Sequence, residues 1–553
     1  MARVDGDIDL PGGMPVIDGS DLVLTGWAHS RPSLVAHVDV WWGRRPLGRA
    51  WLGRPRPDVV AALGDPGAGM CGFELRAPLL RGSGGEDVAL RVTVTLVDGS
   101  VETLARRPAL PRPMLPRRSG GGSPLPRAGR PRRIGIGDEV RVLFSARSFD
   151  LGGSQLRMAE LVEHLNRRGG YRITVHSPSD GPLRALLERN CEDVRCAPAA
   201  PLDDAAAYES SVTELCEWID GRFDLVYGAT VTNFPAVDAA TRLGIPAVLR
   251  VGEAAPLSTV VSWVVGRLDP SVEDAARHAM AGASAVVSNS AAAVRMYRGA
   301  GWSGRFVVLR SGTDVGAAHA AVERMERDVC RERLGVGRDE RLLLCAGSVW
   351  RVKGQAMLVA ALDWIRDVNP HLTCAMVGYA DAVYAAALAQ LVARRGLDDR
   401  VRILPFCNDL SPWWRAADVV VSVSESEATP AVVLEAMAHG VPVFGTRVGD
   451  LPDLIEPGVN GWLCEPSDLA ALIAGLTEVA EAPAETIAAL GAAAARSAAA
   501  NDRTLTLVRS DELMRAVSEG RFPRWASARR TPRSVARGLW RWVRPRATTR
   551  SPL

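Results

Sequence analysis

The chain has 553 residues, 47% of them hydrophobic and 23% charged, which is typical of a soluble globular protein too long for a single hydrophobic core. Its net charge of +3 hides a segregation, because residues 106–133 and 521–553 hold nineteen of the 66 basic residues and no acidic one. Subtracting those segments leaves 47 basic against 63 acidic residues, so we expect an acidic folded body, which argues against a nucleic-acid-binding protein.

The first residues, MARVDGDIDLPGG, are acidic and contain no apolar segment, so no signal peptide is predicted. No run of 18 apolar residues occurs, so no membrane span is predicted. The nine cysteines are scattered without a CxxC pair, which favours buried free thiols. These features together predict a cytoplasmic protein.

Residues 1–105 contain short alternating runs, such as AHVDVWW and VALRVTVTLVDG, separated by Gly, Pro and Asp turns. This alternation, with a hairpin-like DG, predicts a small antiparallel β-sandwich. Residues 106–137 are rich in Pro, Arg and Gly and are predicted to be a linker. The sequence leaves open whether the sandwich binds carbohydrate or protein or is only a spacer.

From residue 138 the pattern changes to apolar strands that alternate with helical segments. Six strands are predicted in residues 138–318, at VRVLFSA, YRITVHS, DLVYGA, PAVLRV, ASAVVSNS and RFVVLRSG. Six more are predicted in residues 339–500, at RLLLCAGS, LTCAMVG, RVRILPF, DVVVSVS, VPVFGT and GWLCEP. Each set is typical of a doubly wound parallel sheet, so we predict an α/β fold with two Rossmann-like lobes and a ligand site in the cleft between them.

The strongest local pattern is SESEATPAVVLEAMAHG, which follows a predicted strand. Thr429 as N-cap and Pro430 at the first helical position predict a helix that runs to Ala438 and ends at Gly440. Glu427 therefore precedes a helix N-terminus, where backbone amides favour a phosphate or a sugar oxygen.

The predicted helix contributes its first amides, at Ala431 and Val432, and one acidic side chain. Glu435 falls in the middle of the helix among apolar residues, where its carboxylate must find donors or face solvent. The spacing from Glu427 to Glu435 resembles the Glu-x7-Glu signature of the retaining nucleotide-sugar glycosyltransferases of family 4, whose two lobes form the GT-B fold.

The resemblance covers roughly residues 138–500 and includes two further motifs. FDLGGSQ, with Gly152 and Gly153, resembles the loop that the donor diphosphate approaches closely. GSVWRVKGQ resembles the family's Gly-Arg-x-x-x-x-Lys-Gly, in which the arginine and the lysine hold the diphosphate. The family's arginine position is Ser348 here, and Arg351 either substitutes for that arginine or lies on the surface.

Lys353, in the same motif, is the only lysine of the chain. Departure of the sugar leaves negative charge on two phosphates, and a fixed cation stabilises that charge. An ammonium is a compact point charge, whereas a guanidinium is a wide planar fork, so a narrow pocket would accept the first and exclude the second. The alternative is that a single lysine lies at this position by chance.

The resemblance implies that Glu427 holds hydroxyls of the donor sugar and that Glu435 holds the ribose hydroxyls of the nucleotide. It also implies retention of the anomeric configuration, with the leaving phosphate accepting the proton of the acceptor. We predict no metal site and no other cofactor. The family's histidine at the end of an N-lobe strand is missing, since AVLRVGEAAP offers only Arg250, Gly252 and Glu253.

Residues 501–553 are predicted to form a helix and a basic tail, which interleaves Trp525, Trp540 and Trp542 with arginines. Such a composition is typical of a segment that lies on anionic lipid, although a disordered basic end or a nucleic-acid contact would have the same composition. We therefore predict a cytoplasmic hexosyltransferase, peripheral on the inner face of the cell membrane, that acts on a glycan or a lipid-linked acceptor.

Two alternative functions stay open at this point. One is a GT-B relative that acts as an epimerase or a phosphorylase. The other is a catalytically silent scaffold that binds sugar nucleotides, an alternative that Ser348 and the missing histidine support.

Overall fold

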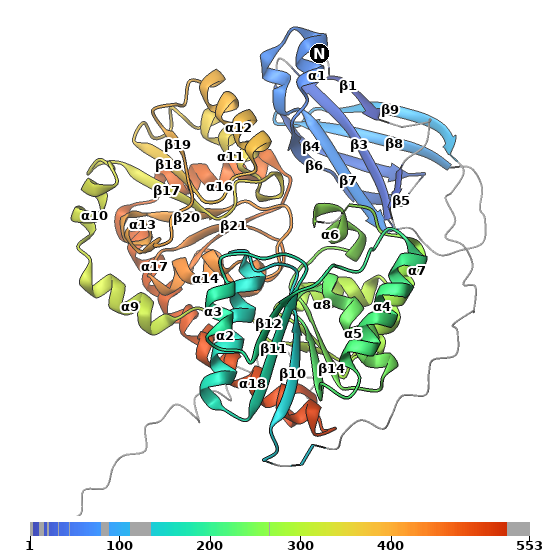
Figure 1. Cartoon of the computed structure of the whole chain (residues 1–553). Helices are drawn as coiled ribbons and strands as arrows, with labels where there is room; N and C mark the ends of the chain where they lie inside the picture. Colours follow the sequence, from blue (N-terminus) through green and yellow to red (C-terminus); the bar gives the residue numbers. More distant parts are fainter. Residues whose placement is uncertain are drawn as a thin grey trace, which may run out of the picture.

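The computed structural model describes residues 4–9, 16–18, 21–30, 33–43, 45–78, 88–110, 134–135, 137–264 and 266–527. The chain folds into an N-terminal β-module and two α/β lobes (Figure 1). This arrangement confirms the predicted fold class. Residues 111–133 and 136 of the predicted linker lie outside the described residues, as do Trp540 and Trp542.

The N-terminal β-module, residues 4–110, consists of two antiparallel sheets that share one hydrophobic core. One sheet has the order β1-β3-β7-β6, with β2 paired to β3, and the other has the order β5-β4-β8-β9. The strands are β1 (Val4–Asp9), β2 (Val16–Asp18), β3 (Asp21–Ser30), β4 (Val35–Trp42), β5 (Arg45–Arg49), β6 (Trp51–Arg54), β7 (Gly72–Pro78), β8 (Val88–Leu96) and β9 (Val101–Leu110). Strand β9 continues five residues beyond the predicted boundary at residue 105. Two short helices, α1 (Pro57–Leu63) and η2 (Pro66–Met70), were not expected from the sequence.

The N-terminal lobe is built on a parallel sheet with the order β12-β11-β10-β13-β14-β15-β16. Its strands are β10 (Val140–Ser145), β11 (Tyr171–Ser177), β12 (Asp193–Cys196), β13 (Leu225–Gly228), β14 (Ala247–Val251), β15 (Ala285–Ser288) and β16 (Phe306–Val308). Its helices are α2 (Gly153–Arg168), α3 (Arg184–Glu188), α4 (Ala205–Ile219), η3 (Val231–Asn233), α5 (Phe234–Arg242), α6 (Leu257–Val264), α7 (Pro270–Gly282) and α8 (Ala291–Gly299). All six predicted strands are present, and β12 is an additional edge strand.

The C-terminal lobe repeats this design with the order β19-β18-β17-β20-β21-β22. Its strands are the six predicted ones: β17 (Arg341–Ala346), β18 (Leu372–Val377), β19 (Val401–Leu404), β20 (Val419–Ser422), β21 (Val443–Thr446) and β22 (Gly461–Cys464). Its helices are α9 (Val315–Arg324), α10 (Arg327–Arg333), η4 (Arg351–Lys353), α11 (Gln355–Trp364), α12 (Ala382–Arg394), α13 (Ser411–Ala416), α14 (Ala431–Ala438), α15 (Leu451–Leu454), α16 (Leu469–Glu481) and α17 (Ala484–Ala498). Helix α9 begins before the predicted lobe boundary at residue 318, yet Val315 and Ala318 pack into the core of this second lobe.

Both sheets reverse their strand order between two central strands, β10 and β13 in one lobe and β17 and β20 in the other. At such a switch point the loops leave toward opposite faces and open a crevice at the carboxyl ends of the strands. The loops that carry Lys353 and Glu427 follow β17 and β20, so both residues arise at the switch point of the C-terminal lobe.

The end of the described chain returns to the N-terminal lobe through η5 (Ala499–Asn501), α18 (Arg503–Ser518) and α19 (Arg524–Ser527). Helix α18 lies against that lobe (Figure 1), and Leu513, Met514 and Val517 enter its core. Trp525, predicted to belong to a lipid-facing tail, packs on the same core and donates its indole N–H to Glu512. Within the described residues, no helix combines the length and the apolar character that a membrane span requires.

Candidate functional site

The loop that carries Lys353 depends on a glycine. Gly354 has a φ of +74°, and a Cβ on it would lie 2.2 Å from the backbone oxygen of Val423. Only glycine accepts both the left-handed backbone and this close approach. The turn η4 therefore packs directly against the segment that leaves β20, and this contact brings Lys353 next to Glu427.

Lys353 and Glu427 form an ion pair between the lysine Nζ and the carboxylate Oε1. Ser424 donates its hydroxyl to the same Oε1 at 2.8 Å and so fixes the orientation of the carboxylate. The lysine side chain is 30% exposed and the glutamate side chain 12% exposed, so both remain within reach of a ligand. The structure thus joins the two residues that the sequence predicts to be catalytic, although they are 74 positions apart.

Helix α14 runs from Ala431 to Ala438, as predicted, but its start differs from the prediction. The N-cap is Pro430, and no side chain in the described structure caps the helix, so the prediction of Thr429 as N-cap is wrong. The hydroxyl of Thr429 instead donates to the backbone oxygen of Asn289, 2.7 Å away in the other lobe. The uncapped first turn leaves the amides of Ala431 and Val432 available to an oxygen or an anion.

Glu435 lies one turn further along α14, and among charged residues Arg157 of α2 in the opposite lobe has the largest effect on its pKa. Burial raises the pKa of Glu435, and the positive charge of Arg157 opposes that rise. Burial also lowers the pKa of Arg157, whose other charged neighbours are Glu160 and Arg503. Glu435 is therefore a half-buried carboxylate whose surroundings include Arg157 of the opposite lobe, and not a fully exposed helical glutamate.

Gly152 and Gly153 form the start of α2, directly after the β10 loop of the N-terminal lobe. Gly152 is the N-cap, and a Cβ on Gly153 would have open space around it to 4 Å. The predicted loop therefore places an uncapped helix N-terminus at the switch point of this lobe, on the helix whose Arg157 interacts electrostatically with Glu435 of α14. Contact with a donor diphosphate stays a prediction for both glycines.

Ser348 and Arg351, on either side of Trp350, have different surroundings. Ser348 is exposed, and its backbone oxygen accepts a hydrogen bond from Gln355 at 2.9 Å. For Arg351 the sequence left open a donor contact or a surface position. Its guanidinium lies instead in an interface with the N-terminal β-module, 3.6 Å from Glu74 and stacked over Trp51.

The two lobes meet through Asp450, a residue that the sequence did not single out. Its carboxylate is fully buried, and Oδ1 accepts from the hydroxyl of Ser290 at 2.9 Å and the amide of Ala291 at 3.0 Å. Its Oδ2 accepts from Arg310 at 2.8 Å and from Thr429 at 3.1 Å. Asp450 therefore ties the N-terminus of α8 and the end of the first sheet to the loop that follows Glu427.

Two exposed aromatic rings also lie at the carboxyl edge of the second sheet. Tyr379 follows β18 and Phe406 follows β19, and their rings stack with centroids 4.1 Å apart. Half of Tyr379 is exposed, and its backbone oxygen accepts a hydrogen bond from Val349 in the Lys353 loop. The sequence contained a signal for this pair, because each aromatic residue comes within two positions of the end of a predicted parallel strand.

At the position of the missing histidine, the N-terminal lobe has a half-buried acidic residue, Glu253. Burial raises the pKa of Glu253, and the charges of Arg250 and Arg147 oppose the rise. Arg250 also reaches Ser311 at 3.5 Å. Across the cleft, Ser426 donates its hydroxyl to the backbone oxygen of Ala254, so this loop touches the Glu427 loop.

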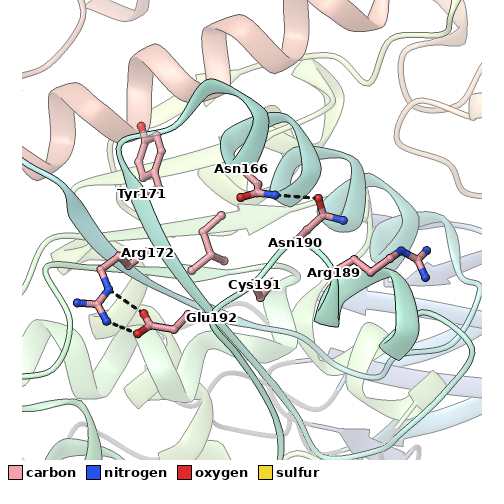
Figure 2. Close-up of a pocket in the computed structure, with 8 residues that line it drawn as sticks. Asn166, Tyr171, Arg172, Arg189, Asn190, Cys191 and Glu192 are labelled. Carbon is pink, nitrogen blue, oxygen red and sulfur yellow. Dashed lines mark hydrogen bonds and ion pairs between the residues drawn. The ribbon is translucent and has the colours of Figure 1, made fainter.

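An open pocket of about 350 Å³ lies at the opposite end of the first sheet, where β11 begins. Four of its side chains form two hydrogen-bonded pairs, Arg172 with Glu192 and Asn166 with Asn190 (Figure 2). None of the predicted site residues lines it. Among the described residues, no group of three or more His, Cys, Asp or Glu side chains is arranged to hold a metal ion.

Comparison with known families agrees with this geometry. A model described as "Glycosyl transferase 4-like domain" matches residues 152–312, and one described as "Glycosyl transferases group 1" matches residues 340–482. These ranges fall on the two lobes. The lobes are a pair of glycosyltransferase domains.

Curated relatives of this glycosyltransferase pair include D-inositol 3-phosphate glycosyltransferases. The protein from Catenulispora acidiphila is 35% identical over 200 residues, which cover 34% of this chain and 48% of that protein. The protein from Pseudarthrobacter chlorophenolicus is 29% identical over 339 residues, which cover 58% of this chain and 79% of that protein. In the first relatives, the match spans about half of their length or less.

Solved structures show the same fold. HepE from Anabaena, in complex with UDP and glucose, has 23% identity and a TM-score of 0.56, over 68% of this chain and 99% of that chain. The sucrose-phosphate synthase of Thermosynechococcus elongatus has 20% identity and a TM-score of 0.55, over 68% of this chain and 98% of that chain. The glycosyltransferase pair therefore has the GT-B fold.

Proposed function

We propose that this chain transfers a sugar from a nucleoside diphosphate sugar to an acceptor, with retention of configuration and without a metal ion. The observation that carries the proposal is the ion pair of Lys353 and Glu427 at the switch point of the C-terminal lobe. A cation suited to a diphosphate and a carboxylate suited to sugar hydroxyls touch each other there. The bond between sugar and diphosphate would lie where these two side chains meet.

The remaining donor contacts follow from the positions of the neighbouring groups. The amides of Ala431 and Val432 at the start of α14 would bind phosphate or sugar oxygens, and Glu435 would accept hydrogen bonds from the ribose. The stacked rings of Tyr379 and Phe406 offer a flat apolar face for the nucleotide base. The structural neighbour HepE, solved with UDP and glucose, supports a uridine nucleotide as the first one to test.

In this mechanism the chain's own groups stabilise the departing diphosphate. Lys353 would exchange part of its ion pair with Glu427 for the phosphate oxygens, and its charge would balance the charge that grows on them. The helix N-termini of α14 and α2 would add partial positive charge from both sides of the cleft. No side chain is assigned as general base, because the leaving phosphate oxygen itself would accept the acceptor's proton.

The acceptor would enter from the N-terminal lobe. This side of the cleft presents Arg157, Arg250 and Arg147 near Glu435 and Glu253, so an acceptor that carries an anionic group suits it. The names of the curated relatives make inositol 3-phosphate one acceptor to test. A glycan or a lipid-linked acceptor at an anionic membrane surface, in the cytoplasm, is the alternative that the basic tail favours.

The single lysine allows a direct test of the donor site. An amine-acylating reagent can modify only Lys353 and the α-amino group, and mass spectrometry separates the two. We expect UDP to slow acylation of Lys353 strongly, because the diphosphate covers the ammonium, whereas uridine leaves the rate unchanged. Equal acylation rates with UDP, uridine and no ligand would refute the proposed contact.

Turnover separates the alternative functions. Thermal-shift measurements with UDP-, GDP- and ADP-sugars identify the donor, since a ligand at 100 times its Kd stabilises the folded state by about 2.7 kcal/mol. Nucleotide release that requires an acceptor and persists in EDTA supports metal-independent transfer. Isomerisation of the donor without an acceptor indicates an epimerase, and transfer of the glycosyl group to added inorganic phosphate indicates a phosphorylase. Donor binding without turnover indicates a silent scaffold.

A further inference from the structure

The N-terminal β-module is docked on the C-terminal lobe, although the chain connects it to the N-terminal lobe. Four apolar side chains of the module pack against the hydrophobic core of the C-terminal lobe: Leu34, Leu52, Met70 and Val97. The approach is close enough to require a glycine at one point. A Cβ on Gly53, whose φ is +80°, would lie 3.0 Å from the Cβ of Ala356 on α11.

The first link from the module to the donor site passes through Arg351. This residue opens the three-residue turn that ends in Lys353. Its guanidinium lies over the ring of Trp51, 5.4 Å from the centroid, and 3.6 Å from a carboxylate oxygen of Glu74. The Glu74 side chain is only 9% exposed, and within the module its carboxylate also binds Arg54 at 3.2 Å and Arg76 at 3.1 Å, so Arg351 is a third cationic partner.

The second link passes through Glu425, two residues before Glu427. Its side chain is buried, and Oε1 accepts a hydrogen bond from the amide of Leu52 in β6 at 3.1 Å. Its own amide donates to the backbone oxygen of Val352, 2.8 Å away in the Lys353 turn. Glu425 therefore contacts the module with its side chain and the turn with its backbone.

These two links meet, since Arg351 is the charge that most opposes the burial of Glu425. Arg351, whose side chain is 16% exposed, thus interacts electrostatically with an acidic residue of each part, Glu74 of the module and Glu425 of the lobe. Through Arg351 and Glu425, the Lys353 turn and the Glu427 loop both contact the N-terminal β-module.

We propose that the N-terminal β-module is a working part of the nucleotide-sugar site, in which Glu74 and Glu425 are positioning residues that hold the Lys353 turn and the Glu427 loop in register. The inference rests on the proposed function in assigning Lys353 and Glu427 to the donor. A shift of such loops by about 1 Å is enough to lower turnover strongly, because the reacting groups must be held in a near-attack geometry.

The interface itself supplies a matched control. Arg49 donates to Asp468 at 2.9 Å, which is also an ion pair between the module and the C-terminal lobe. Asp468 caps α16, and neither residue belongs to the two loops. Arg49→Gln therefore removes a docking contact of the same kind without touching Arg351 or Glu425.

Hydrogen–deuterium exchange on the full chain tests the coupling without a donor. We expect Glu74→Gln to increase exchange in residues 347–355 and 424–430, and Arg49→Gln to leave exchange there unchanged. Arg351→Gln, which leaves the module's own residues intact, should reproduce the effect of Glu74→Gln. Unchanged exchange in both Glu74→Gln and Arg351→Gln would overturn the proposal, as would an equal increase in Arg49→Gln.

Calorimetric measurement of UDP binding then tests whether the contacts between the module and the two loops affect the donor site. We expect Glu74→Gln to weaken UDP binding about five-fold. The double variant Glu74→Gln/Arg351→Gln should bind UDP no more weakly than Glu74→Gln alone, because both substitutions remove the same contact between Glu74 and Arg351. If the two substitutions lowered UDP affinity independently and additively, the proposal that Glu74 positions the turn through Arg351 would be contradicted. If the unaltered chain does not bind UDP or any nucleotide tested, the proposed function fails, while the exchange data still decide whether the module holds the loops.

Discussion

The buried carboxylate of Asp450 provides the most demanding test of how the two lobes are held together. The substitution Asp450→Asn keeps the size of the side chain and replaces one oxygen by an NH2 group. Each Asp450 oxygen accepts at least two hydrogen bonds, from Ser290 and Ala291 on one and from Arg310 and Thr429 on the other. The amide can satisfy only one of these sets, and its NH2 group then faces donors.

The magnitude follows from the bonds lost. With its oxygen toward Ser290 and Ala291, the amide loses the charge-assisted bond from Arg310, of about 1.5–3 kcal/mol. It also loses the 3.1 Å bond from Thr429, which contributes only about 1 kcal/mol because the single hydroxyl proton is shared with the closer oxygen of Asn289. Arg310 keeps a second partner, Asp453, at 2.8 Å, and its side chain is 23% exposed, so part of this loss returns. We expect a decrease of about 2–3 kcal/mol in the free energy that joins the lobes.

Asp453→Asn is the matched control, because Asp453 binds the same arginine from the same short helix but is 32% exposed. We expect it to cost less than about 1 kcal/mol. Calorimetry reports the melting temperature of each variant, and small-angle X-ray scattering reports separation of the lobes as an increased radius of gyration. Equal melting temperatures and scattering curves for Asp450→Asn and Asp453→Asn would refute the reasoning.

Three further predictions concern single positions. Gly354→Ala should lower the melting temperature and abolish UDP binding, because the added Cβ would overlap a backbone oxygen at 2.2 Å. Gly335→Ala, with a φ of +63° and only an ordinary contact of the added Cβ with Arg402 at 3.8 Å, should show the milder effect of backbone strain alone. Burial lowers the pKa of His176 to about 4, so the unfolded chain binds its proton first and stability falls as the pH drops from about 6.5 toward 4, by up to about 3 kcal/mol. His176→Phe should flatten this part of the dependence of melting temperature on pH, and an unchanged slope would contradict the assignment. Burial raises the pKa of Glu435, so UDP binding through its carboxylate should weaken on acidification at a higher pH than it would for an ordinary glutamate. The UDP affinity of Glu435→Gln should lack this dependence on pH. Identical pH profiles of UDP affinity in the two proteins would count against the role of Glu435.

Much of the fold was predictable because its signals are local. Strands buried on both faces are near-continuous apolar runs, and all twelve such runs that the sequence shows in residues 138–500 are strands of the two sheets. The strand that was missed, β12, is an edge strand whose residues DVRC are half-buried or exposed, so it lacks that signal. The start of helix α14 was misjudged for a related reason. A threonine before a proline predicts a cap locally, whereas the hydroxyl of Thr429 has partners in the opposite lobe and on Asp450.

The chemical groups of the candidate site were also visible in the sequence. Lys353 stands out as the single lysine, and Glu427 and Glu435 stand out by their spacing around a predicted helix start. The identity and the position of each of these residues can be read from the sequence. The contact between Lys353 and Glu427 cannot, because it depends on two loops that meet at a switch point of the folded sheet.

Only the tertiary structure decided which charges face one another. Leu52 and Glu425 are 373 positions apart and share a hydrogen bond, and Ser290 and Asp450 are 160 positions apart. No local pattern encodes such pairs, because a buried charge is stable wherever the fold brings it enough donors or an opposite charge. The sequence by itself therefore determined two Rossmann-like lobes and the residue types of a donor site, and the folded chain decided that Arg351 belongs to the module interface and Asp450 to the contact between the lobes.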